Sequence, residues 1–217
     1  MSRIFAGAIA VVGWLSLILQ FVLAMINPIE PEPGAAERFV RFFSYFTVLT
    51  NIIVAATTTA IAFFPAAKLG RFASRPTVRC AVAVYISIVG LVYSLFLRSV
   101  WDPQGWQSVA DHALHDAIPL AYVLYWLTSA PKDGISWIEP LKWLVYPLTY
   151  MAYSFARGAV AMWYPYWFVD VTQLGYSTAL TNSALVLTAF VVVGAVYVVL
   201  AKLLRSDPAG RSGAQSA

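Results

Sequence analysis

Residues 183–201 read SALVLTAFVVVGAVYVVLA, a run without a single charged side chain. About 20 apolar residues in a helix are enough to cross the hydrocarbon core of a bilayer. This run belongs to the last of six such stretches, which lie near 4–26, 40–64, 80–101, 113–130, 141–162 and 177–201. None has the period-two alternation of barrel strands, and only helices or closed barrels satisfy their backbone groups in lipid. The sequence therefore predicts an all-α, polytopic membrane protein with six transmembrane helices.

The composition supports this class. Hydrophobic residues make up 60% of the chain and charged residues only 11%, a balance that a soluble domain could not keep dispersed. The six helices form one predicted domain over 1–204, and the polar segment 205–217 is predicted to be a disordered tail. The single Cys80 excludes a disulfide framework and a cysteine-based metal cluster. Because the sequence has no glycine-rich phosphate loop, dinucleotide fingerprint or haem motif, we expect no cofactor.

The basic residues predict the orientation. When alternate loops are assigned to one face, ten Lys and Arg fall on that face and four on the other. By the positive-inside rule, both termini are then cytoplasmic. The net charge of +4 is thus a topology signal and not a nucleic-acid footprint. The ten are Arg3, Lys68, Arg71, Arg75, Arg79, Lys132, Lys142, Lys202, Arg205 and Arg211, and the four are Arg38, Arg41, Arg98 and Arg157.

Polar residues gather in the outer half of this predicted bundle. Ionisable groups within or bordering a membrane helix are costly unless paired or hydrated, so a common layer of them favours a cavity with a function. Interfacial snorkelling explains the two arginines of the layer equally well. The layer consists of Gln20, Ser44, Thr47, Asn51, Arg98, His112, His115, Asp116, Arg157 and Asp170.

Thr47 and His115 are the predicted chemical pair. A threonine hydroxyl becomes a nucleophile when a neighbouring imidazole accepts its proton. If the second helix starts near Phe39, Thr47 lies about 12 Å along it at 1.5 Å per residue, close to the depth of His115. Asp111 and Asp116 lie four residues from His115 and His112, so either carboxylate can fix an imidazole tautomer.

Four short motifs resemble a family of bacterial six-helix membrane proteins. They are FSYFTVLTN at 43–51, LHDAIPL at 114–120, WLVYP at 143–147 and YPYWFVD at 164–170. They are similar, more distantly, to the eukaryotic androgen-induced gene product and the androgen-dependent TFPI-regulating protein, multi-pass threonine hydrolases of fatty acid esters of hydroxy fatty acids. The resemblance implies a bacterial inner-membrane protein in which Thr47 is the nucleophile and His115 its partner. Asp111 and Asp116 depart from the family pattern, which has Asn and Thr there.

The resemblance thus implies a threonine-type carboxylic ester hydrolase that acts on a lipid or acyl ester drawn from the bilayer. Asn51 or Arg157 would then help to hold the oxyanion, with Ser44 and Gln20 also lining the cavity. Thr50 and Thr178 are rival nucleophiles, the second because residues 45–51 partly match residues 176–182. Two alternatives stay open: a zinc hydrolase built on His112, His115 and a carboxylate, and a protein that only binds or transports lipid.

Overall fold

A computed structural model describes residues 2–26 and 34–205, and this part of the chain is predominantly helical and contains no strand. The all-α prediction is confirmed, while the predicted tail lies outside the described residues except for Arg205. The α-helices are α1 (Ser2–Ile26), α2 (Ala35–Phe42), α3 (Phe46–Phe63), α4 (Lys68–Ala73), α5 (Pro76–Val92), α6 (Trp106–His112), α7 (Ile118–Ser129), α8 (Glu139–Trp143), α9 (Val145–Ala161) and α10 (Val171–Leu203). Two π-helical turns, η1 (Tyr93–Leu97) and η2 (Ala113–Ala117), and a 3₁₀ turn, η3 (Trp167–Val169), complete the list.

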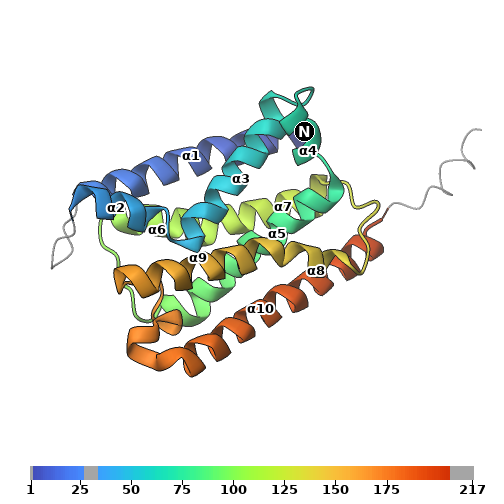
Figure 1. Ribbon diagram of the computed structural model, residues 1–217. Coiled ribbons are helices and arrows are strands. Elements are labelled where there is room, and N and C mark those ends of the chain that lie inside the picture. The colour runs from blue at the N-terminus through green and yellow to red at the C-terminus, as the bar shows by residue number, and fades with distance from the viewer. Residues whose placement is uncertain (1, 27–33, 206–217) are drawn as a thin grey trace, which may run out of the picture.

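Four helical segments are long and apolar enough to cross a membrane, namely Ser2–Ile26, Phe46–Phe63, Pro76–Leu97 and Val171–Leu203. The chain is therefore described as a membrane protein. The other two predicted segments correspond to α7 and α9, of 12 and 17 residues. Both are extended at their N-terminal ends, since α6, η2 and α7 follow one another without a break and only Leu144 separates α8 from α9. In the ribbon these two composite rods lie alongside the longer helices (Figure 1).

The prediction of one helix over 40–64 was wrong, because the chain breaks between α2 and α3. Tyr45 has extended backbone angles, φ −82° and ψ 128°, directly before the first turn of α3. The Tyr150 hydroxyl donates to the Ser44 carbonyl at 2.9 Å, so a side chain from α9 replaces a hydrogen bond that the break removes. Thr47, expected well inside a helix, consequently lies in the first turn of α3.

Glycines allow close contacts between helices. A Cβ built on Gly13 of α1 would lie 3.2 Å from the Ala55 side chain of α3. On Gly90 of α5 it would lie 3.3 Å from the His115 carbonyl oxygen and 3.4 Å from Pro119. Small residues let helix backbones approach in this way inside membranes. Gly90 therefore holds α5 against the segment that carries His115.

Candidate active site

Thr47 and His115 meet between α3 and η2. His115 Nε2 lies 3.3 Å from Thr47 Oγ1, within hydrogen-bonding distance. Both side chains are shielded, with Thr47 9% exposed and the His115 side chain 14%. The prediction that these two side chains lie close together is confirmed. A neutral imidazole in this position is suited to accept the threonine proton.

Asp111 contacts the opposite edge of the imidazole, at Nδ1. His115 Nδ1 lies 3.0 Å from the Asp111 backbone oxygen and 3.2 Å from its carboxylate Oδ1. Both contacts need a proton on Nδ1, which leaves Nε2 free to accept one from Thr47. Asp111 is only 4% exposed, and the Tyr93 hydroxyl donates to its second oxygen. The Tyr93 ring stacks on His115 with centroids 4.0 Å apart and planes 14° from parallel. The imidazole is thus fixed both in its plane and across it.

Two π-helical turns bring these groups together. Tyr93 opens η1, and His115 lies in η2. In η2 the Ile118 N–H bonds to the Ala113 carbonyl, five residues back. In this register position 119 should supply the next N–H, to the Leu114 carbonyl, but a proline has none. Such turns widen a helix by one residue and are frequent at functional sites.

Asn51 completes the hydrogen bonding of η2. Its Nδ2 donates to the Leu114 carbonyl at 3.2 Å and to the Thr47 carbonyl at 2.9 Å. The two contacts use both amide hydrogens, and Asn51 is fully buried. In this arrangement Asn51 has no donor left for the predicted oxyanion, because the oxygen that remains can only accept. Its observed role is to join the first turn of α3 to the turn that carries His115.

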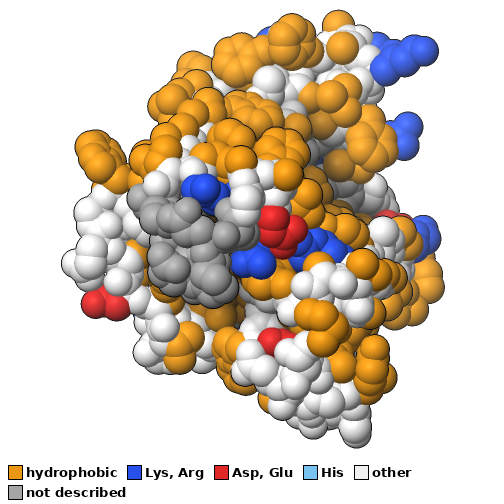
Figure 2. Space-filling model, turned by 60° about the vertical axis from the view of Figure 1, so that its left-hand side comes forward, with side chains coloured by type: hydrophobic (Ala, Val, Ile, Leu, Met, Phe, Trp, Pro, Cys, Tyr) orange, Lys and Arg blue, Asp and Glu red, His pale blue; other side chains and the backbone are white. Residues whose placement is uncertain are grey.

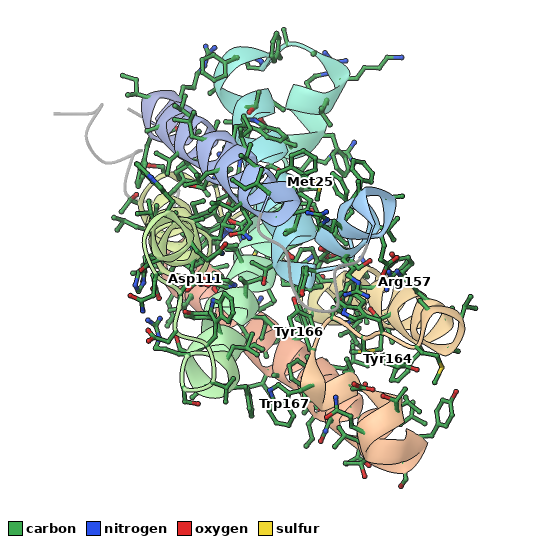
Figure 3. The ribbon with its side chains drawn as sticks, turned by 90° about the vertical axis from the view of Figure 1, so that its left-hand side faces the viewer. Met25, Asp111, Arg157, Tyr164, Tyr166 and Trp167 are labelled. Atoms are coloured by element: carbon green, nitrogen blue, oxygen red, sulfur yellow. The ribbon has the colours of Figure 1, made fainter. Side chains whose placement is uncertain are left out.

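Tyr166 supplies the polar group on the cavity side of Thr47. The Thr47 N–H donates to the Tyr166 hydroxyl at 3.3 Å. The N–H groups in the first turn of a helix have no partner within the helix and carry its positive dipole end. A hydroxyl that accepts from one of them keeps its own hydrogen for another acceptor. In the view down this end of the bundle, Tyr166 lies between Asp111 and Arg157 (Figure 3).

A small apolar cavity of about 50 Å³ adjoins Thr47. Among the described residues, the hydroxyl groups at its wall belong to Thr47, Tyr93, Tyr150 and Tyr166. The remaining lining residues are Phe46, Ile88, Val89, Val92, Leu97, Pro147, Met151, Phe168, Val169, Val186 and Phe190. The lining suits a short apolar segment with a reactive polar atom beside Thr47.

Other predicted site residues have their own partners. The Ser44 hydroxyl contacts the Val40 carbonyl at 2.7 Å and the Tyr153 hydroxyl at 2.8 Å. Gln20 accepts from Gln107 Nε2 at 2.8 Å. Neither Ser44 nor Gln20 lines the apolar cavity, so their predicted position at its wall is wrong.

The charged residues of the predicted layer fall into separate pairs. His112 and Asp116 bond to each other at 2.8 Å, and Arg98 also bonds to Asp116. Asp170 accepts from the Thr172 N–H at 2.9 Å and caps α10. Arg157 does not line the cavity and instead donates to Glu37 at 2.7 Å. Within 2–26 and 34–205, no three His, Cys, Asp or Glu side chains are grouped to hold a metal ion.

The rival threonines lie away from the imidazole. The Thr50 hydroxyl, fully buried, bonds to the Tyr146 hydroxyl at 3.0 Å. Thr178 is exposed on α10. Neither has a hydrogen bond to a histidine among the described residues, so Thr47 is the threonine that faces a base.

Sequence reasoning missed Tyr93 and Tyr166. Tyr166 stands in one of the four motifs, but a tyrosine near the end of a membrane helix is typical of an interfacial belt, so the motif carried no chemical signal. Tyr93 lies inside an apolar run. Its stacking on His115 and its hydrogen bond to Asp111, both to another helical segment, distinguish it from a packing residue.

Comparison with known proteins gives no match for this chain to any protein-family model, curated protein or solved structure.

Proposed function

We propose that this protein is a membrane-embedded ester hydrolase in which Thr47 is the nucleophile, His115 the general base and Asp111 the residue that orients the base. The observation that carries the proposal is the chain of contacts from Thr47 Oγ1 through both ring nitrogens of His115 to the buried Asp111 carboxylate. A nucleophile, a base and a group that orients the base are the parts of a catalytic triad. Alone, a threonine beside a histidine would be weak evidence.

The proposed reaction has two steps. Thr47 Oγ1 attacks the ester carbonyl carbon while its proton passes to His115 Nε2. The tetrahedral intermediate then expels the alcohol, which takes that proton, and leaves the acyl group on Thr47. In the second step His115 accepts a proton from water, the resulting hydroxide attacks the acyl carbon, and the proton returns to Thr47 as the carboxylic acid leaves. Asp111 stabilises the imidazolium formed in each step.

Tyr166 is our candidate for the oxyanion donor. Its hydroxyl accepts from the Thr47 N–H and lines the cavity, so its own hydrogen is available to the negative oxygen of the tetrahedral intermediate. The positive end of the α3 dipole, at Thr47, favours the same charge. This assignment replaces the roles first considered for Asn51 and Arg157.

The apolar lining of the cavity beside Thr47 supports a substrate with an acyl chain. The resemblance to threonine hydrolases of fatty acid esters of hydroxy fatty acids suggests the same substrate class, delivered from the bilayer. We also propose that the composite rods α6–η2–α7 and α8–α9 cross the membrane, which makes six spans and places both termini in the cytoplasm. A cytoplasmic reporter fused after Ala217 should then be active, and activity from an external reporter alone would refute this topology.

Labelling with a fluorophosphonate probe tests the chemistry. Purified protein should be labelled on Thr47, as mapped by mass spectrometry. Thr47→Ala and His115→Ala should each abolish labelling and ester hydrolysis, and the double variant should lose little more, because members of one catalytic unit are not additive. Thr50→Ala is the matched control and should keep both activities. A wild-type protein that is never labelled and hydrolyses no ester would favour the lipid-binding alternative.

A further inference from the structure

Two arginines from different helices share one carboxylate oxygen near the site. Arg41 Nε and Arg157 Nη2 each donate to Glu37 Oε1 at 2.7 Å. Basic and acidic side chains lie next to one another near the middle of the face that Figure 2 shows. The Arg41–Glu37 pair lies within α2, four residues apart, whereas the Arg157–Glu37 pair joins α9 to α2. The three described charges leave a surplus of one positive charge.

Both guanidinium groups also lie against one indole ring. The Cζ atoms of Arg41 and Arg157 are 4.9 Å and 4.8 Å from the centroid of Trp163. Such contacts favour cations and hold these two close together despite their like charge.

One N–H donor group of Arg157 is unpaired among the described residues. Its side chain is 11% exposed, and among the described residues its buried Nη1 has no hydrogen-bond partner. A buried donor without a partner destabilises the fold. An arginine with a purely structural role would be expected to have all of its buried donors paired. Nη1 and Nη2 together form the fork that suits a carboxylate with two parallel hydrogen bonds.

An aromatic wall connects this cluster to the reactive threonine. The Tyr45 ring contacts Trp163 and Tyr166 edge to face, with centroids 5.7 Å and 5.9 Å apart. Tyr166 in turn bonds to the Thr47 N–H. Three rings in series, those of Trp163, Tyr45 and Tyr166, therefore connect the arginine pair to Thr47.

We propose that Arg157 binds the carboxylate head group of an amphiphilic, long-chain ligand. The ligand carboxylate replaces Glu37 on Arg157 and engages both Nη atoms, while Glu37 stays on Arg41 of its own helix. Two arginines then face two carboxylates, so the surplus charge is neutralised. The inference rests on the proposed function in one respect: the ligand is the substrate, an ester that also carries a free carboxylate, or the hydroxy acid or fatty acid released from it.

Binding of a free fatty acid tests the proposal without any hydrolysis. We would titrate detergent-solubilised full-length protein with 9,10-dibromostearic acid, its methyl ester and a brominated alkyl phosphate. Quenching of tryptophan fluorescence is the readout, and Trp163→Phe identifies the contribution of that ring. The acid should bind roughly tenfold more tightly than the neutral methyl ester, the scale of one charge-assisted hydrogen bond.

The variants should move in opposite directions. Arg157→Gln should weaken binding of the acid by roughly tenfold and leave the methyl ester unaffected. Glu37→Gln should tighten binding of the acid, because the competing carboxylate has lost its charge. Arg205→Gln, which removes one exposed arginine at the opposite end of the bundle (Figure 1), is the charge control and should change neither.

Several results would overturn the proposal. They are equal binding of acid and methyl ester by the wild type, weaker acid binding in Glu37→Gln, and tighter binding of the phosphate than of the carboxylate. If Arg157→Gln does not fold, the Glu37→Gln titration and the comparison of ligands on the wild type still test the proposal. A protein that binds the acid as expected but hydrolyses no ester would refute the proposed hydrolase and leave the carboxylate site intact.

Discussion

Replacing Asp111 with Asn tests whether a buried carboxylate supports the imidazole. The substitution keeps the size of the side chain, and its Oδ1 can still accept from the Tyr93 hydroxyl. Its Nδ2 would then face His115 Nδ1, where a carboxylate oxygen now lies at 3.2 Å. The negative charge beside the imidazolium of the transition state is lost.

The structure gives the scale of the effect. Two unit charges 3.2 Å apart interact by about 5 kcal/mol at an effective dielectric constant of about 20. An Asp-to-Asn change in a serine triad costs about 10⁴-fold in kcat, partly through the wrong tautomer. Here the Asp111 backbone oxygen, 3.0 Å from Nδ1, still favours the correct tautomer. We therefore expect a loss of about 3 to 4 kcal/mol, or roughly 10²- to 10³-fold in kcat.

The assay is ester hydrolysis in mixed micelles, together with the rate of fluorophosphonate labelling and the thermal unfolding midpoint. Asp116→Asn is the matched control, because Asp116 pairs with His112 and Arg98 and has no bond to His115. It should lower kcat by less than about threefold, as expected for an exposed pair. The reasoning is refuted if folded Asp111→Asn keeps more than a tenth of the wild-type kcat, or if Asp116→Asn is equally damaging.

Three further predictions concern the oxyanion donor, the helix contact and the ion pair. Tyr166→Phe should lower kcat by roughly 10²-fold, the cost of one lost oxyanion donor, with KM little changed; a normal kcat in steady-state hydrolysis would exclude that role. Gly90→Ala places a Cβ 3.3 Å from the His115 carbonyl. It should lower the free energy of unfolding by about 1 to 3 kcal/mol and also lower kcat. Gly7→Ala is the control, because its Cβ would lie 3.6 Å from the nearest neighbour, and it should change neither quantity. The hydrogen bond from Arg41 on α2, then that from Arg157 on α9, lowers the pKa of Glu37. Its ion pairs therefore stabilise the fold above the unfolded pKa of about 4.3 and lose this effect as pH falls through the lower folded value. The unfolding midpoints of wild type and Glu37→Gln should thus differ at pH 7, and the difference should shrink as pH falls below about 4.3; a constant difference would contradict this.

Local chemistry explains why the sequence could predict the chemical pair. Thr47 and His115 stand in the short sequence motifs at 43–51 and 114–120, which are read from consecutive residues without knowledge of the helix geometry. The four-residue spacing from Asp111 to His115 brings them together in any helical turn, including the π-helical one observed. By contrast, the depth argument for Thr47 started from a helix beginning near Phe39, and α3 begins at Phe46.

What the sequence by itself determined is the helical class and the membrane setting, because lipid requires each spanning segment to be apolar and to satisfy its own backbone. These are properties of consecutive residues. Tertiary structure alone decided where the backbone departs from a regular helix. The break at Ser44 is satisfied by Tyr150 of α9, and the Leu114 carbonyl by Asn51 of α3. Both partners are far away in sequence, so no local pattern records them, and these irregular turns are what bring Thr47 to His115.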